Sequence, residues 1–236
     1  MALQEFYFVI ADISGYTKFV TAHRESLMHA ERIIGNLLET IIACVRPPLE
    51  VHELMGDAVV ICGAGERITA DEIYHLMTDM HHRFVEAESN HVSRCSLCSC
   101  AACTQVGQLR LKIIAHRGHA VRTIVGGRQK ISGEDVIEVH RWLKNGIPSN
   151  EYYLLTEAVY QDLAPATQQL MEKHAEQLEG LGIRTAFYQT LNQDMVPVDA
   201  SFGKKLARHV QLNVHGLLRR LGKRRPPFLH LPESQS

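Results

Sequence analysis

The sequence predicts an α/β or α+β fold in which helices surround one mixed β-sheet. Helix-like and strand-like segments alternate along the chain, and two strand-length segments meet in a tight hairpin. The composition, with 45% hydrophobic and 22% charged residues, is that of an ordinary globular protein. A chain of 236 residues is long enough to bury a full hydrophobic core.

The first elements are a buried strand and a long amphipathic helix. The apolar run from Phe6 to Ala11 has the length of a strand and stops at Asp12, after which loop residues follow. From Leu27 to Val45, apolar residues recur at steps of three and four, which predicts a helix that ends before Pro47.

The next segments predict a hairpin and a second long helix. Glu50–Met55 and Ala58–Cys62 have strand length, and the Gly-Asp pair at 56–57 between them is the spacing of a two-residue turn. Residues 69–88 begin with Thr69 as an N-cap, carry acids in the first turn and place apolar residues on one face.

The second half of the chain predicts short elements that complete the sheet. We expect strands at Leu109–His116 and Ala120–Val125, separated by a turn at Arg117 and Gly118. The remaining expected elements are helices at Gly133–Lys144, Glu157–Leu163 and Thr167–Gln177, and strands at Tyr152–Thr156 and Thr185–Leu191.

Two aspartates at the ends of core strands carry the strongest chemical signal. Asp12 and Asp57 both stand where a strand gives way to a Gly-containing turn. A single strand-end aspartate usually caps a turn. Two such aspartates together can share hard divalent cations through their oxygens and leave room for phosphate oxygens.

Four segments resemble the signature motifs of class III nucleotidyl cyclases, in the order that this family has them. The segments are Phe8-Val9-Ile10-Ala11-Asp12-Ile13-Ser14-Gly15-Tyr16-Thr17, Glu53-Leu54-Met55-Gly56-Asp57-Ala58, Leu111-Lys112-Ile113-Ile114-Ala115-His116-Arg117-Gly118 and Ile131-Ser132-Gly133-Glu134-Asp135-Val136. The resemblance covers roughly residues 6 to 190. It implies a ferredoxin-like mixed sheet with flanking helices.

The resemblance implies a site for two metal ions, Mg²⁺ or Mn²⁺, and a nucleoside triphosphate. Asp12, the Ile13 carbonyl and Asp57 match the family's metal ligands. The backbone N–H groups that would face phosphate at the start of the next helix belong to Ser14, Gly15, Tyr16 and Thr17. An ordinary turn is the alternative interpretation of that loop.

The matching positions for base and transition-state contacts depart from the family pattern. Glu53 resembles the base-reading residue of guanylyl cyclases, but Lys130 stands where the family usually has aspartate or cysteine. Arg141 matches the transition-state arginine, whereas Ile137 stands in place of the asparagine that orients the ribose, and its side chain cannot hydrogen-bond. His140 or Asn145 would replace that asparagine in a different helix register.

A cysteine cluster interrupts the cyclase-like pattern at residues 91–106. Its two C-x₂-C elements suit thiolate ligation of Zn²⁺, although one residue between them is a short separation for a single tetrahedral ion. His81, His82 or His91 would then supply a ligand; an iron–sulfur cluster and unligated thiols are the alternatives. The candidate ligands are Cys95, Cys98, Cys100 and Cys103.

The fourteen histidines are scattered along the chain. We therefore expect surface or satisfied core positions for most of them, and His116 and His119 beside Gly118 are no exception.

The net charge of −1 hides an asymmetric distribution. Residues 200–236 carry 8 basic and 1 acidic residue, against 17 basic and 25 acidic residues before them. With apolar residues at near-helical spacing, this tail predicts a basic amphipathic extension at 193–236 after a cyclase-like domain at 1–192. It would contact a membrane surface weakly, bind a partner protein or cover its own domain.

Nucleic acid is not an expected ligand, because no aromatic residues are interleaved with the basic ones of the tail. Without an apolar run of membrane-spanning length or a signal-like start, we expect a cytoplasmic location.

The sequence therefore predicts a divergent cyclase-like protein that converts a nucleoside triphosphate to a 3′,5′-cyclic nucleotide. The family resemblance implies a head-to-tail homodimer, in which the metal aspartates and the transition-state residues come from opposite subunits. A catalytically inactive nucleotide-binding or dimerisation module with a structural metal site is the alternative, which Ile137 favours and the aspartate pair opposes.

Overall fold

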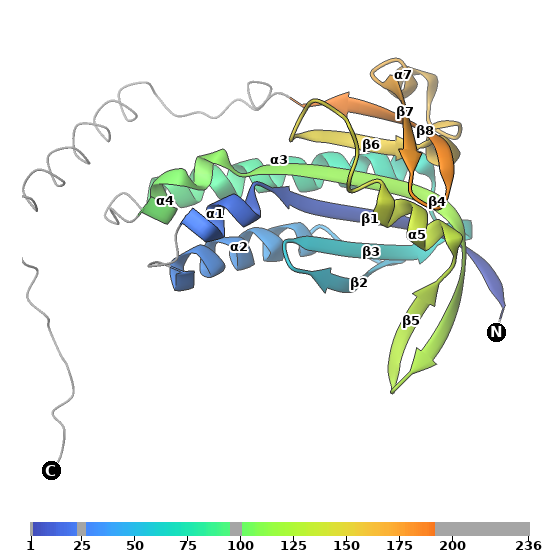
Figure 1. Ribbon diagram of the computed structural model, residues 1–236, viewed down its shortest axis with the longest axis horizontal. Coiled ribbons are helices and arrows are strands. Elements are labelled where there is room, and N and C mark those ends of the chain that lie inside the picture. Colours follow the sequence, from blue (N-terminus) through green and yellow to red (C-terminus); the bar gives the residue numbers. More distant parts are fainter. Residues whose placement is uncertain (1, 23–26, 95–100, 192–236) are drawn as a thin grey trace, which may run out of the picture.

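The computed structural model describes residues 2–22, 27–94 and 101–191. These residues form one mixed eight-stranded sheet with the order β2-β3-β1-β4-β6-β8-β7, and β5 pairs with β4 outside this path. Figure 1 shows the β4–β5 hairpin projecting from the body of the sheet. The predicted extension at 193–236 and Cys95, Cys98 and Cys100 lie outside the described residues.

Strand β1 (Leu3–Ser14) lies inside the sheet, between two neighbouring strands. It pairs antiparallel with β3 (Ala58–Ala64) on one side and with β4 (Arg110–Val125) on the other. Its residues from Phe6 to Ala11 are all buried, which is why this segment is a continuous apolar run.

Two core clusters occupy the two faces of the sheet. Side chains of α2 (Leu27–Ile42) and α3 (Ala70–Arg94) pack on one face with the odd-numbered residues of β1. The other face carries Phe6, Phe8 and Ile10 under Trp142 and Val139, the latter in α5 (Glu134–Arg141). Figure 1 shows α5 and the pair α2 and α3 on opposite sides of the sheet.

Several predicted elements are confirmed. The hairpin of β2 (Leu49–Met55) and β3 turns at residues 56–57, and Gly56 has a φ of 63°. Helix α3 starts with a capping box, in which the N–H of Thr69 donates to Glu72 Oε2 at 2.8 Å and the Thr69 hydroxyl accepts from the N–H of Glu72 at 3.3 Å. The remaining short elements are β6 (Tyr152–Thr156), α6 (Glu157–Tyr160) and β8 (Gly182–Thr190).

The predicted turn at Arg117 and Gly118 is wrong, because β4 runs through both residues. Gly118 pairs with Phe6 of β1, and Arg117 pairs with Tyr7. A Cβ atom at Gly118 would collide with the Asp135 carboxylate of α5. The glycine therefore marks a close approach of a helix to a strand rather than a turn.

The predicted helix at Thr167–Gln177 is also wrong. Only the single turn α7 (Pro165–Gln168) is helical, and β7 (Glu172–Leu178) pairs antiparallel with β8. The sequence of β7 is rich in helix formers, but its burial alternates with a period of two. Pairing with β8 outweighs the local helix propensity at this edge of the sheet.

Strand β5 (Arg128–Ser132) and helix α1 (Tyr16–Ala22) were not predicted as separate elements. Gly126 and Gly127 connect β4 to β5 with φ values of 58° and 76°, the left-handed conformation that a two-residue hairpin turn requires. This Gly-Gly pair between β-branched and polar residues is a readable hairpin signal. Among the described helices, none is both long and apolar enough to cross a membrane.

A buried polar cluster joins α3 to the sheet. His81 Nε2 lies 2.8 Å from Glu151 Oε1, and Arg110 Nε lies 3.5 Å from Glu151 Oε2. Arg110 Nη1 also lies 3.8 Å from Glu88 Oε1. Burial raises the pKa of Glu88 to about 7, Arg110 lowers it and Glu151 raises it.

We expect the Glu88→Gln variant to remove a pH dependence of stability. The ordinary pKa of this carboxyl is 4.5, so between this value and about 7 the folded chain retains a proton that the unfolded chain has lost. Stability therefore falls as pH rises through this window, by about 3 kcal/mol. Urea unfolding between pH 4.5 and 8 measures this slope.

The matched control is Glu86→Gln, because Glu86 is exposed on the same helix. An equal slope in the parent and in Glu88→Gln would contradict the assignment.

Candidate functional site

The two strand-end aspartates lie together at one end of the central strands. Asp12 is opposite Ala58 in the β1–β3 register, so it is adjacent to the turn that holds Asp57. The N–H of Ile13 donates to the Asp57 carbonyl at 3.1 Å, which closes the turn onto β1. The structure therefore brings two sequence-predicted metal ligands to one site, with Ile13 between them.

Lys112 is a charged residue of this site that the sequence analysis did not single out. It lies opposite Asp12 in the β1–β4 register, and its Nζ is 3.0 Å from Asp12 Oδ2. The same amine donates to the carbonyl of Leu143 at 3.1 Å, just beyond α5. The pairing depends on which residues of β1 and β4 face each other, and this register cannot be read from either strand alone.

The electrostatics of the site are those of two carboxylates that repel each other. Burial raises the pKa of Asp57, and the nearby Asp12 carboxylate raises it further. A backbone hydrogen bond and Lys112 act in the opposite direction. A cation placed between these carboxylates relieves the repulsion, and Lys112 supplies one positive charge on the Asp12 side.

The predicted phosphate loop leads directly into helix α1. Gly15 has a φ of 93°, and its carbonyl accepts from the N–H of Phe19, so the helix begins with the N–H groups of Tyr16 and Thr17. The Tyr16 hydroxyl donates to Glu31 Oε1 at 3.3 Å. Ser14 is the last residue of β1, and Tyr16 and Thr17 already belong to α1, so Gly15 alone connects the strand to the helix.

The other sequence-predicted residues lie on separate elements. Glu53 is exposed on the edge strand β2, and Lys130 is exposed on β5. Arg141 ends α5, where its Nη1 is 2.7 Å from Glu179 Oε2, and Ile137 on the same helix is 51% exposed. Within the described part of the chain, no hydrogen bond or ion pair joins Glu53, Lys130 or Arg141 to the aspartates.

Only part of the predicted cysteine site is described. Cys103 is 3% exposed in α4 (Ala101–Gln105), and its Sγ lies 3.9 Å from His29 Nδ1. His81, one of the alternative ligands, already pairs with Glu151. For His91, burial and the neighbouring His29 lower the pKa.

Sequence comparisons relate this chain to one family and to one mycobacterial relative. Residues 34–152 match the family model described as "Protein of unknown function (DUF2652)". The "Uncharacterized protein Rv2561/Rv2562" of Mycobacterium tuberculosis is 30% identical over 192 residues, which cover 80% of this chain and 89% of that protein.

Solved structures similar to this one are cyclase domains and a cyclase-like protein. The adenylyl cyclase CyaB from Pseudomonas aeruginosa is 13% identical with a TM-score of 0.58, over 83% of this chain and 97% of that chain. The guanylate cyclase domain of RhGC from Catenaria anguillulae, in complex with GTP, is 13% identical with a TM-score of 0.57, over 82% and 100%.

A third similar structure is a class III adenylyl cyclase-like ATP-binding protein from Pseudomonas aeruginosa. It is 21% identical with a TM-score of 0.57, over 71% of this chain and 36% of that chain. These similarities establish that the chain has the fold of class III nucleotidyl cyclase catalytic domains, as the sequence resemblance implies.

We expect Lys112→Met to destabilise the metal-free protein and to increase its response to Mn²⁺. Without the amine, Asp12 and Asp57 repel each other with less compensation, which costs roughly 1 kcal/mol or about 2–4 °C in Tm. Bound Mn²⁺ removes that penalty. Thermal unfolding followed by circular dichroism, with and without Mn²⁺, measures both effects.

Lys173→Met is the control, because Lys173 is exposed on the distant edge strand β7. If Mn²⁺ raised the Tm of Lys112→Met no more than that of the parent, Lys112 would not compete with a cation.

Proposed function

Because this chain belongs to the family described as "Protein of unknown function (DUF2652)" and has the class III cyclase fold, we propose that it is a divergent nucleotidyl cyclase. It would convert a nucleoside triphosphate into a 3′,5′-cyclic nucleotide and pyrophosphate. The observation that carries this proposal is the juxtaposition of Asp12 and Asp57, which the Ile13–Asp57 hydrogen bond holds at the end of β1. Two of the structurally similar proteins are described with a nucleotide, GTP or ATP.

The donor set of the aspartate site suits Mg²⁺ or Mn²⁺. Asp12 and Asp57 offer carboxylate oxygens, and the family resemblance adds the Ile13 carbonyl. The raised pKa of Asp57 supports this fit, because two neighbouring carboxylates gain from a shared cation. Two such ions would neutralise charge at the triphosphate and would acidify the ribose 3′-hydroxyl.

The reaction balances without a further reactant. The 3′-hydroxyl releases its proton to solvent, its oxygen bonds to the α-phosphorus, and pyrophosphate leaves with the electron pair of the broken P–O bond. In this scheme the N–H groups of Tyr16 and Thr17 bind phosphate oxygens at the start of α1. Lys112 holds the Asp12 carboxylate in place through an ion pair of 3.0 Å.

A homodimer is part of the proposal, since Arg141 ends α5 and pairs with Glu179 rather than with the aspartates of its own chain. In the family that this chain resembles, the transition-state arginine acts on the partner's substrate. Exposed apolar residues on α5 and on the β4–β5 hairpin support such an interface, with Ile137, Ile124 and Val125 at 51%, 74% and 62% exposure. Glu53 on β2 would hydrogen-bond the base of the nucleotide, and Lys130 would lie beside that base.

An inactive nucleotide-binding module is the second candidate, and Ile137 favours it. Its exposed side chain stands at the position of the family's ribose-orienting asparagine, and it offers no hydrogen bond. Lys112 also occupies one oxygen of Asp12. One similar structure is itself described as a cyclase-like ATP-binding protein.

Two further proposals come from the sequence and concern the cysteine segment and the C-terminal segment. We propose a structural Zn²⁺ site in the cysteine segment, which the approach of Cys103 Sγ to His29 Nδ1 supports, since thiolates and imidazoles are both zinc ligands. The basic segment 193–236 is proposed as an extension that contacts a membrane surface or a partner protein.

We expect purified protein to form a cyclic nucleotide from at least one of ATP, GTP, CTP and UTP with Mn²⁺ or Mg²⁺. Asp57→Asn should lower turnover by about 100-fold or more, because metal binding supplies several kcal/mol of transition-state stabilisation. Chromatographic separation of the products measures turnover and identifies the base. Asp79→Asn, on the exposed surface of α3, is the matched control. No cyclic product from any triphosphate at dimer-forming concentrations would refute the cyclase proposal.

We expect Ile137→Asn to raise turnover by about tenfold, since the amide restores a hydrogen bond to the ribose. The exposed position accepts asparagine without leaving a core cavity. The same product assay measures the change, with circular dichroism as a check on folding. Triphosphate binding without product in both the parent and Ile137→Asn would instead establish the binding module.

A further inference from the structure

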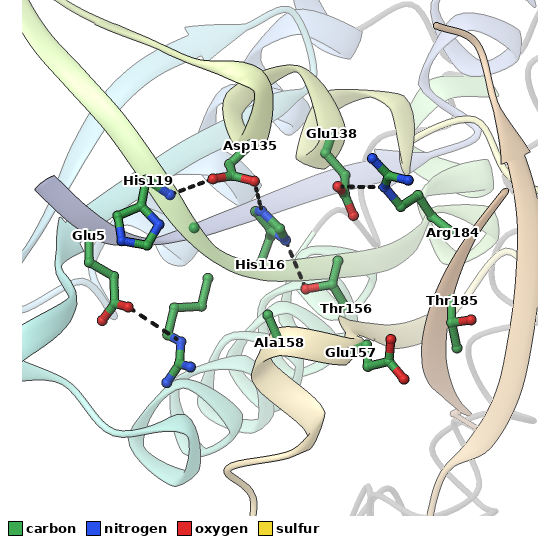
Figure 2. Close-up of a pocket in the computed structure, with 12 residues that line it drawn as sticks. Glu5, His116, His119, Asp135, Glu138, Thr156, Glu157, Ala158, Arg184 and Thr185 are labelled. Atoms are coloured by element: carbon green, nitrogen blue, oxygen red, sulfur yellow. Dashed lines mark hydrogen bonds and ion pairs between the residues drawn. The ribbon is translucent and has the colours of Figure 1, made fainter. Parts of the chain in front are cut away.

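A second polar site lies on the face of the sheet that α5 covers. A pocket of about 370 Å³ is bounded by β4, α5, β8 and the β6–α6 junction (Figure 2). Three of its lining residues, His116 of β4 and Asp135 and Glu138 of α5, place one potential ligand atom each within 4.8 Å of one another. They converge because Asp135 and Glu138 are three residues apart on one helix face.

His116 is held in the orientation that a metal ligand needs. The residue is 4% exposed, its ring stacks on Phe8, and its Nδ1 lies 2.8 Å from the Thr156 hydroxyl. When Nδ1 donates to this hydroxyl, Nε2 presents a lone pair. Nε2 is buried, lies 3.3 Å from Asp135 Oδ1, and has no hydrogen bond of good geometry with any described residue. Figure 2 shows His116 between Thr156 and Asp135.

The two carboxylates are positioned by the backbone and by the core. Asp135 Oδ2 accepts from the N–H of His119 at 2.5 Å, and it lies against Gly118, where any side chain would displace it. Glu138 is 8% exposed, and its two oxygens accept from Trp142 Nε1 and Arg184 Nε, each at 3.3 Å. These contacts leave lone pairs on both carboxylates.

The side chains of this cluster carry more negative than positive charge. Glu134, Asp135 and Glu138 carry three negative charges, and Arg184, which pairs with Glu134 and Glu138, carries one positive charge. With His116 neutral, the sum is −2. A divalent cation neutralises this excess, and burial of the ligands makes that neutralisation worth more than on the surface.

We propose that His116, Asp135 and Glu138 bind one divalent transition-metal cation, of the Zn²⁺ or Mn²⁺ class. One imidazole nitrogen with two carboxylates is a borderline donor set, whereas Mg²⁺ and Ca²⁺ prefer oxygen ligands alone. Three protein ligands leave coordination positions that open into the pocket. Thr156 is the outer partner that fixes the histidine.

This site is separate from the aspartate site of the proposed cyclase. Lys112, which contacts Asp12, precedes His116 by four residues on β4. Four residues of extended strand span about 13 Å, so the same ion cannot serve both sites. A cation here would tie α5 to β4 and would thereby fix the helix that carries Ile137 and Arg141.

The test is Zn²⁺ and Mn²⁺ binding to the full-length chain, by metal analysis after equilibrium dialysis, and by the metal-induced rise in Tm. Asp135→Asn and Glu138→Gln should each bind one ion fewer per chain than the parent, or bind it at least about tenfold more weakly. Both variants keep the size of the side chain and an acceptor oxygen. Circular dichroism establishes that each variant is folded.

Glu134→Gln is the matched control, because Glu134 pairs with the same Arg184 from the same helix but does not belong to the ligand group. It should bind as many ions as the parent. Asp57→Asn and the triple variant Cys95→Ser/Cys98→Ser/Cys100→Ser identify ions lost from the other two proposed sites. When Asp135→Asn is combined with either of these variants, the loss of one more ion per chain than in that variant alone supports an independent site.

Equal ion counts and equal Tm shifts in the parent, Asp135→Asn and Glu138→Gln would overturn the proposal and leave Arg184 as the counter-ion of this cluster. If neither substitution folds, His116→Phe, which keeps a ring on Phe8 but removes both nitrogens, gives the same two alternatives.

Discussion

The burial of β1 on both faces is the constraint on which the rest of the structure depends. Its central apolar run pairs with β3 on one side and β4 on the other, so water reaches neither its edges nor its faces. A polar residue can enter such a strand only near its end, and at this end β3 gives way to the β2–β3 turn. Asp12 stands at this point, and the β2–β3 turn delivers Asp57 to it. The hydrophobic core thus determines where charge can collect.

Much of the fold could be predicted from local patterns, because these elements carry their own signals. The apolar run of β1, the Gly-Asp turn and the capping box of α3 each specify a structure within a few residues. The elements that were predicted wrongly depend on contacts between distant parts of the chain. Gly118 is required by the carboxylate of Asp135 on α5, which packs against it, and β7 is a strand only because β8 is beside it. Neither cause is present in the local sequence.

The two candidate sites also differ in how much of each can be recognised from local sequence. Asp12 lies near the end of β1, Asp57 lies in the turn after β2, and both carry family-like neighbours, so local sequence is enough to single them out. Lys112 and His116 lie within β4 and gain their roles from the register of β4 with β1 and from the placement of α5. His116 can be recognised as a candidate ligand only because the fold places two carboxylates, three residues apart in the sequence, beside it.

The length of β4 has a consequence for how this family can diverge. Lys112 and His116 project from the same face of one uninterrupted strand, and their separation fixes the spacing between the two polar sites. Insertion or deletion of a single residue between them would turn one of the two side chains toward α2 and α3, into the opposite core. Substitutions can therefore accumulate in this segment of the strand, whereas changes in its length should be absent from functional relatives.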